Sequence, residues 1–194
     1  LTVREWWQRL SSAGLTNPGL TQPFGKGWGR TETRVLAAAL RERGAIGSPA
    51  GLGMLLAAPT ILAHGNETQI DSYVPRILDG TDAWCQLFSE PGAGSDLAGL
   101  QTKAIRDGDE WVITGQKVWT SDGQHADLGM RIARTDPDAP KHRGISWFAF
   151  PMRQEGVEVR PLREMTGRSL FNEVFIDEAR VCLLYTSDAA DERS

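Results

Sequence analysis

The sequence has few cysteines and no long apolar run. Its two cysteines, Cys85 and Cys182, lie far apart among 194 residues, so we expect no disulfide framework and take a reducing cytoplasm as the default location. The longest apolar run, Leu52–Ala63, is shorter than the ~20 residues of a membrane-spanning helix. The chain begins at Leu1 and shows no charged-then-apolar targeting segment, so neither a membrane anchor nor a leader is predicted.

Neither sign of charge dominates the sequence, which has 21 basic and 25 acidic side chains apart from histidine. The formal net charge is −4 and the chain contains only 3 histidines, and no basic block is present that would attract nucleic acid or an anionic membrane. We predict no metal site. The length allows one large or two small domains with an apolar core.

Apolar residues at helical spacing characterise residues 1–82, which we predict to be a helical domain. The third helix is apolar nearly all round, which implies burial. His64 is interpreted as a helix-end residue rather than a ligand. The predicted helices span 2–13, Thr31 or Thr33 to Gly44, 50–64, and a last segment from Asn66, where Gln69 completes a capping box and Pro75 kinks the helix or ends its first half.

The pattern changes to strands after residue 82. Predicted strands span 84–90, 102–106, 110–119, 127–134, 144–151, 156–160 and 173–181, with Asp107-Gly108 as a hairpin turn. Because no helices separate these strands, we predict an α+β fold in which the helical domain precedes an antiparallel β-sandwich or barrel over 83–181. Arg131 interrupts an apolar strand, and a buried unpaired arginine is costly, so we expect it at an edge or interface.

A polar loop follows the first predicted strand. Residues 83–99 read AWCQLFSEPGAGSDLAG, and their apolar run stops at Ser89 and Glu90. Glycines let backbone N–H groups approach a ligand, and Ser89 and Ser95 add hydroxyls, so the loop suits a polar cofactor. A dinucleotide fingerprint lacks its third glycine here, and a phosphate loop lacks its lysine. A tight turn in which Asp96 caps backbone donors is the open alternative.

A second polar loop ends the strand predicted over 110–119. Trp119 offers a flat apolar face, and the hydroxyls and N–H groups of Thr120 and Ser121 lie next to it in the chain. A flavin ring requires such a stacking surface together with donors at its edge. An ordinary core tryptophan is the alternative, and it is the usual role of Trp at a strand end.

Three strings in the chain resemble the acyl-CoA dehydrogenase family. They are QLFSEPGAGSDLAG, which resembles the flavin-binding signature of that family, DGDEWVITGQKVWTSDG, and LREMTGRSLFNEVFIDEARV. The segment GNETQIDSYVPRILDG is also similar to the last helix of the family's N-terminal domain. The resemblance covers residues 50–181 and, more loosely, the start of the chain.

The resemblance implies cofactor contacts in the first loop. Gln86, Phe88 and Ser89 would line FAD through backbone groups and the Ser89 hydroxyl. Ser95 would contact the cofactor or the acyl-CoA substrate. Gln86 stands where the family often has an aromatic residue, and Ser89 where threonine is commoner.

The resemblance also implies contacts in the second loop. Trp119 would pack beside the isoalloxazine, with Thr120 and Ser121 donating to its edge. Thr120 replaces a common aliphatic residue and Ser121 a threonine, and both keep hydrogen-bonding capacity, so FAD binding is still expected.

The implied reaction is the introduction of an α,β double bond into an acyl-CoA thioester. The family's base is a carboxylate in a C-terminal helical domain that this chain does not include. We therefore assign no catalytic residue, expect the fragment alone to be inactive, and interpret Glu90, Glu110 and Glu173 as structural. The implied partners are an acyl-CoA, an electron-transfer flavoprotein and further copies of the full-length chain.

Two other functions are kept open. The same fold could reoxidise its flavin with oxygen, as acyl-CoA oxidases and related monooxygenases do, or serve as a non-catalytic flavoprotein. Residues 182–194 depart from the family pattern after Val181 and have no periodicity, so we interpret this tail as foreign sequence.

Overall fold

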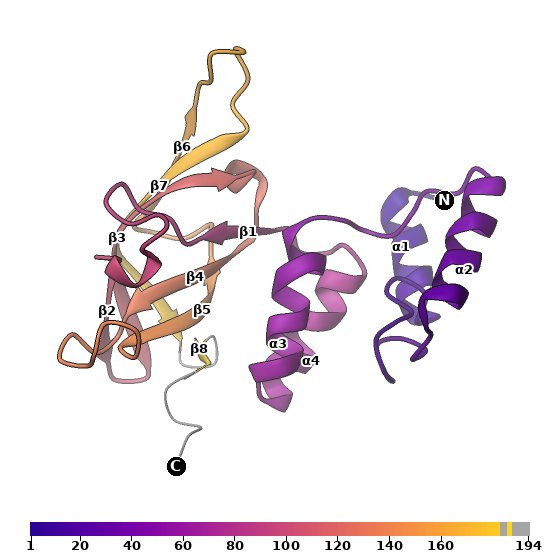
Figure 1. The fold of residues 1–194 in the computed structure, drawn as a ribbon, viewed down its shortest axis with the longest axis horizontal. Helices are drawn as coiled ribbons and strands as arrows, with labels where there is room; N and C mark the ends of the chain where they lie inside the picture. Colours follow the sequence, from indigo (N-terminus) through magenta and orange to yellow (C-terminus); the bar gives the residue numbers. More distant parts are fainter. Residues whose placement is uncertain (183–185, 188–194) are drawn as a thin grey trace. The chain divides into compact units, whose positions relative to one another are not determined.

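The computed structural model describes residues 1–182 and 186–187. The chain divides into two compact units, Leu1–Asp82 and Ala83–Ser194. The first is built from helices and the second from a curled sheet (Figure 1). No helix in the described part of the chain is both long and apolar enough to cross a membrane.

The helical unit confirms the predicted Asn66–Gln69 capping box and the predicted Thr2 cap. Thr2 caps α1 together with Glu5, and Asn66 caps α4 together with Gln69. In each box the side chain of the N-cap residue accepts a hydrogen bond from the backbone N–H of the third helical residue. The side chain of that third residue accepts in turn from the backbone N–H of the N-cap, so two backbone donors are satisfied. The helical segments are α1 (Val3–Ser12), α2 (Arg30–Glu42), the π-helical turn η1 (Gly53–Ala57), α3 (Ala58–His64) and α4 (Glu67–Leu78).

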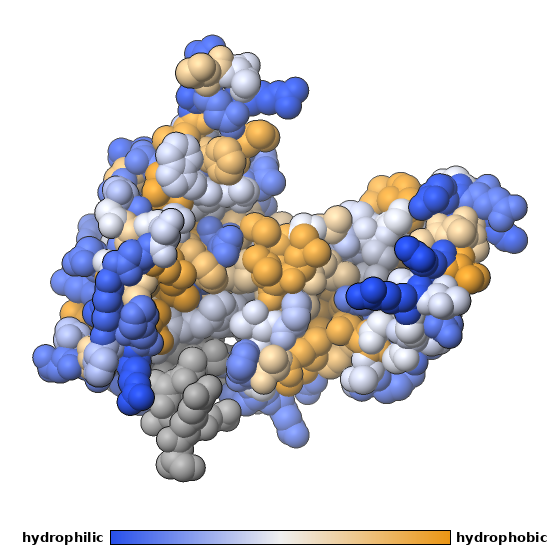
Figure 2. Space-filling model, viewed as in Figure 1, coloured by the Kyte–Doolittle hydropathy of each residue, from blue (hydrophilic) through white to orange (hydrophobic). Residues whose placement is uncertain are grey.

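Helix α4 contains Pro75 in its interior and continues to Leu78. Two details of the helical prediction are wrong. Helix α2 starts at Arg30 after Gly29, so neither Thr31 nor Thr33 is its cap. The third predicted helix contains the π-helical turn η1, and it is not buried all round because Leu55 is 70% exposed. Figure 2 shows apolar side chains on the surface in the region of α3.

All the strands predicted from the sequence are present in the second unit. They are β1 (Trp84–Leu87), β2 (Lys103–Asp107), β3 (Glu110–Ser121), β4 (Leu128–Arg134), β5 (Ile145–Pro151), β6 (Val157–Leu162) and β7 (Phe171–Cys182). A further short strand, β8 (Thr186–Ser187), pairs with β5. The rest of the tail that we interpreted as foreign sequence, 183–185 and 188–194, lies outside the described residues.

The strands form one curled sheet with the order β6-β7-β3-β2-β4-β5-β8, and β1 pairs with β4. Most neighbours are antiparallel, and β2 and β3 form the predicted hairpin. The sheet is nevertheless mixed, because β1 runs parallel to β4 and one residue pair joins β2 to β4 in parallel. The α+β class is confirmed, whereas the purely antiparallel pairing is corrected.

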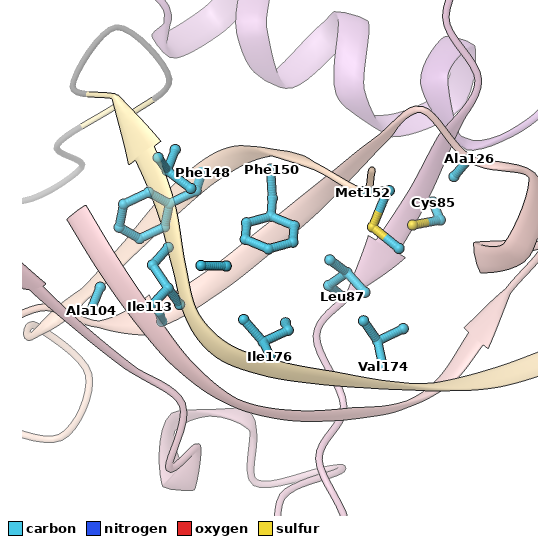
Figure 3. Close-up of a cluster of buried hydrophobic side chains, with 13 residues drawn as sticks. Cys85, Leu87, Ala104, Ile113, Ala126, Phe148, Phe150, Met152, Val174 and Ile176 are labelled. Atoms are coloured by element: carbon cyan, nitrogen blue, oxygen red, sulfur yellow. The ribbon is translucent and has the colours of Figure 1, made fainter. Parts of the chain in front are cut away.

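The concave side of the sheet encloses the apolar core (Figure 3). Side chains from β1, β5 and β7 point toward one another there, among them Leu87, Phe150 and Ile176. Trp111 of β3 packs edge-on against Phe148. Leu87 is both a member of this core and the last residue of β1, so the packing fixes the end of β1 where the first candidate loop begins.

The expectation for Arg131 is wrong. Arg131 lies in β4 between β1 and β5 rather than at a sheet edge, and its side chain is fully buried. Its guanidinium carbon lies 4.6 Å from the centroid of the Phe150 ring.

Candidate functional site

Hydrogen bonds bring the two candidate loops side by side. The backbone N–H of Val118 donates to the carbonyl of Ser89 over 2.9 Å. The Lys117 Nζ donates to the carbonyl of Phe88 over 3.0 Å. The polar segment after β1 therefore lies against the end of β3, although the two segments are about thirty residues apart in the chain.

Trp119 is presented outward by a β-bulge. Residues 118 and 119 of β3 lie opposite the single residue Glu173 of β7, because Lys117 pairs with Val174 and Thr120 with Asn172. A bulge of this kind re-aims a side chain. Trp119 itself has the left-handed φ of 61°, and its side chain is 62% exposed.

The exposed indole is supported from within the same unit. Phe171 meets Trp119 edge-to-face, with 6.0 Å between the ring centroids. Such an arrangement is the preferred geometry of an aromatic pair. One indole face is thus left to the solvent, so Trp119 is not an ordinary core tryptophan in this structure.

The three predicted contacts of the first loop lie at its start. Gln86, Phe88 and Ser89 are half-buried. The carbonyls of Phe88 and Ser89 already accept from Lys117 and Val118, so these two oxygens are engaged within the protein. The Ser89 hydroxyl makes no hydrogen bond to any described residue and can serve a ligand.

The glycine-containing turn after Ser89 is tight, and its glycine backbone is not covered by other described atoms. Glu90 and Ala93 exchange two backbone hydrogen bonds. A Cβ placed on Gly92 or Gly94 would have no described atom within 4 Å, so this backbone is accessible to a ligand. Ser95 is exposed at the end of the turn.

The far end of this loop is tied to the segment between β4 and β5. Asp96 forms an ion pair with Lys141, and the Arg134 Nη2 donates to the carbonyl of Ala98 over 2.7 Å. Asp96 therefore pairs with a lysine side chain rather than acting as the local cap that the alternative interpretation requires.

The two predicted donors beside Trp119 differ in exposure. Thr120 is fully buried, and its hydroxyl has no hydrogen-bond partner among the described residues. Its carbonyl accepts from the Asn172 side chain over 2.9 Å. Ser121 is half-buried and pairs with Phe171 in the strand ladder. Of these two side chains, only that of Ser121 is accessible from outside.

A buried ion pair lies beneath both loops. The Lys117 Nζ is 2.9 Å from the Glu90 Oε1, and neither side chain is more than 5% exposed. The Glu90 carboxylate also accepts from the backbone N–H of Gln101 over 2.6 Å and of Thr102 over 3.0 Å. Three donors thus bond one carboxylate within one small buried cluster.

Burial opposes both charges of this pair. Burial alone raises the pKa of the Glu90 carboxyl, but hydrogen bonds from Thr102, Gln101 and Lys117 outweigh it and hold that pKa below its usual value. Burial lowers the pKa of Lys117 to about 8, although Glu90 acts in the opposite direction. The pair is therefore ionised at neutral pH at a cost in desolvation.

Arg131 adds a second buried cation. None of its three guanidinium nitrogens has a hydrogen-bond partner among the described residues. Burial lowers the pKa of Arg131 below its ordinary range, and Glu90 is the charge that opposes this shift. One carboxylate thus faces two cations inside the sheet.

The sequence interpretation missed Lys117 and Phe171. A signal for Lys117 was present, because it lies at even spacing from Trp111 and Ile113, whose side chains face the core. The carboxylates that were interpreted as structural are all engaged: Glu90 by Lys117, Glu110 by Arg180 and Glu173 by Gln116. No signal in the sequence indicated Phe171.

The residues present fit a flavin. An exposed indole face, an available Ser89 hydroxyl and the accessible backbone of Gly92 and Gly94 lie on two loops that touch. A flavin ring needs an aromatic surface and edge hydrogen bonds. No cluster of three or more His, Cys, Asp or Glu side chains that could bind a metal occurs among the described residues.

Two family models match the chain in succession. The acyl-CoA dehydrogenase N-terminal domain matches residues 2–81, and the acyl-CoA dehydrogenase middle domain matches residues 85–179. The chain belongs to the acyl-CoA dehydrogenase family.

Individual relatives agree with this assignment. The chain is 52% identical to acyl-CoA dehydrogenase FadE34 of Mycobacterium tuberculosis over 89% of its own length and 24% of the relative's. It is 44% identical to acyl-CoA dehydrogenase IpdE1 of the same organism, over 91% of its length and 46% of the relative's.

A solved structure has the same fold. A variant of the Tcur3481-Tcur3483 steroid ACAD superposes with a TM-score of 0.79 at 35% identity, and the match covers 95% of this chain and 48% of that one. The chain therefore spans about half the length of this structure and of IpdE1, and about a quarter of FadE34.

Proposed function

We propose that this chain supplies the flavin-binding part of an FAD-dependent acyl-CoA dehydrogenase, which introduces an α,β double bond into an acyl-CoA thioester. The observation that carries the proposal is the adjacency of the Ser89 and Trp119 loops, with the indole of Trp119 turned outward. Family membership supports the same conclusion.

The described residues would hold the flavin from two sides. The Trp119 indole would pack beside the ring, while the Ser89 hydroxyl and the backbone near Ser121 would bond its polar edge. Ser95, at the exposed end of the turn, would contact the cofactor or the acyl-CoA. When bound, FAD supplies the hydride acceptor for the reaction.

The acid–base group of the reaction is proposed to come from outside this chain. Glu90 is buried against Lys117, and Glu110 is paired with Arg180. Glu173 accepts from the Gln116 side chain. Because these carboxylates are engaged, we expect the 194-residue chain alone to be inactive and the full-length protein to carry the base.

Partners of the full-length protein follow from the same proposal. An electron-transfer flavoprotein would accept the electrons, and several copies of the chain would assemble into an oligomer. The similarity to a protein titled a steroid ACAD makes a CoA thioester with a bulky steroid group a substrate to test beside straight and branched acyl-CoAs.

A tryptophan exchange tests the flavin site. In the full-length protein, Trp119→Ala should weaken FAD binding roughly tenfold or more, because a stacking aromatic surface is lost. Trp28→Ala, which removes a partly exposed tryptophan of the helical unit, is the matched control. Equal FAD affinity in wild type and Trp119→Ala would contradict the proposed site.

The oxidase alternative requires a different measurement. Oxygen consumption on addition of an acyl-CoA, without need for an electron-transfer flavoprotein, would favour an oxidase of the same fold. Electron transfer to the acceptor flavoprotein, with little oxygen uptake, is the result that the dehydrogenase proposal expects.

A further inference from the structure

We propose that Lys117 is a positioning residue that fastens the two flavin loops together through Glu90. We call Lys117 and Glu90 the buried clasp. The inference rests on the proposed flavin site and adds a residue whose role is to hold that site in shape.

The clasp touches the first loop at two points. The Lys117 Nζ donates to the carbonyl of Phe88 over 3.0 Å and to the Glu90 Oε1 over 2.9 Å. Phe88 and Glu90 flank Ser89, the residue whose hydroxyl would bond the proposed flavin. One ammonium group therefore fixes the backbone on both sides of Ser89.

The clasp also fixes where Trp119 begins its turn outward. Lys117 is the last residue of β3 that pairs in register with β7 before the bulge. The next residue, Val118, donates its N–H to the carbonyl of Ser89 over 2.9 Å. Trp119 follows with a left-handed φ of 61°. Because a bulge is a local interruption of pairing, an anchored residue on its near side sets the direction of the side chain.

The Glu90 carboxylate reaches a third segment. Its Oε2 accepts from the Gln101 N–H over 2.6 Å, and its Oε1 accepts from the Thr102 N–H over 3.0 Å. These residues end the glycine-containing loop that starts at Glu90. The carboxylate thus closes that loop at its base, and the turn that carries Ser95 is held at both ends.

Burial distinguishes the clasp from a surface ion pair. The side chain of Lys117 is 0% exposed and that of Glu90 is 5% exposed. The ion pair Arg180–Glu110, which joins β7 to β3, is 3.0 Å long but about half exposed. Removing one partner of a buried pair leaves an uncompensated charge, whereas an exposed pair is easily replaced by water.

Three variants and one control separate positioning from general stabilisation. The full-length protein is prepared with Lys117→Met, with Glu90→Gln and with both changes, and Arg180→Met serves as the exposed control. The measurements are FAD affinity, thermal unfolding, and hydrogen exchange of the amides of Gln101, Thr102 and Val118.

The double variant distinguishes a positioning role from general stabilisation. It contains neither charge of the clasp, but Arg131 loses the opposing charge of Glu90, so its thermal stability should recover only in part relative to Lys117→Met. The bonds to Phe88 and to both loop amides are still missing or weakened, so FAD affinity should stay reduced by roughly tenfold or more. Exchange of the three amides should stay faster than in the wild type, and Arg180→Met should match the wild type.

Two results would overturn the inference. The first is a double variant that regains wild-type FAD affinity together with its stability. The second is unchanged exchange of the three amides in Glu90→Gln. If the wild-type protein binds no FAD, the proposed function fails instead, and the amide exchange alone still decides whether the clasp orders the two loops.

Discussion

Replacing Arg131 by leucine should stabilise the protein. Arg131 is fully buried, and its three guanidinium nitrogens have no hydrogen-bond partner among the described residues. Leaving a buried polar group unsatisfied costs about 1–3 kcal/mol, and more when the group is charged. Leucine removes this cost and keeps an apolar side chain against Phe150.

Two losses reduce the gain from Arg131→Leu. The guanidinium lies 4.6 Å from the Phe150 ring centroid, and such a contact contributes about 0.5–2 kcal/mol. The attraction to Glu90 is also lost. We therefore expect a net increase of about 1–2 kcal/mol in the free energy of unfolding, within the range found when buried charges are replaced by apolar residues.

Thermal unfolding at neutral pH, followed by circular dichroism or calorimetry, measures this change. An increase of this size raises the melting temperature by several degrees, at about 2–8 °C per kcal/mol for domains of this size range. Arg153→Leu is the control, because the Arg153 side chain is mostly exposed and only weakly paired with Asp127. A fall of more than about 1 kcal/mol for Arg131→Leu would refute the reasoning, since it would mean that the buried guanidinium is compensated.

Three further predictions concern the same unit. Burial alone would raise the pKa of Glu90, but hydrogen bonds from Thr102, Gln101 and Lys117 lower it; its contribution to stability should therefore be complete above the ordinary glutamate pKa of about 4.3 and decline as pH falls through the folded-state pKa. The stability difference between wild type and Glu90→Gln, measured by denaturant titration, should accordingly be larger at pH 7 than at pH 3, and a difference that is constant with pH would contradict the assignment. Cys182 is exposed, whereas burial raises the pKa of Cys85 to about 12, so a thiol reagent should label Cys182 in the native protein and Cys85 only after unfolding; rapid labelling of Cys85 in native Cys182→Ser would count against the packing of β1. Phe148→Ala should lower the free energy of unfolding by about 3–5 kcal/mol, because Phe148 is fully buried against Trp111, and a loss below about 1 kcal/mol in a denaturant titration would be inconsistent with that core.

Local signals in the sequence predicted the local structure. The Asn66–Gln69 capping box and the Asp107-Gly108 hairpin depend on residues a few positions apart, and both are present. Alternating apolar residues likewise located every strand from β1 to β7. Such features require no knowledge of distant partners.

The remaining features depend on residues far apart in the chain. The parallel pairing of β1 with β4 joins segments about forty residues apart, and no local pattern specifies it. The burial of Arg131 also depends on distant residues, because β1 and β5 flank β4 and the Phe150 ring packs on the guanidinium. We expected Arg131 at a sheet edge or interface because burying an unpaired cation is costly. The structure nevertheless buries it without a hydrogen-bond partner among the described residues.

The residues of the candidate site were chosen from the sequence, but their presentation could not be. Ser89 and Trp119 were selected from local composition together with the family resemblance, whereas the outward direction of Trp119 depends on a bulge against β7. The burial of the Thr120 hydroxyl also depends on that packing, and its carbonyl accepts from Asn172, which is 52 residues away. The sequence therefore indicates which residue types could bind a cofactor, but not the direction in which their side chains point.

An anaerobic titration of the full-length protein with acyl-CoA substrates tests the central claim most directly. The flavin's visible absorbance is followed in the presence of straight, branched and steroid-bearing thioesters. We expect the isolated protein to contain FAD and at least one thioester to bleach it in proportion to the substrate added. A full-length protein that neither contains FAD nor binds added FAD would contradict the proposed function.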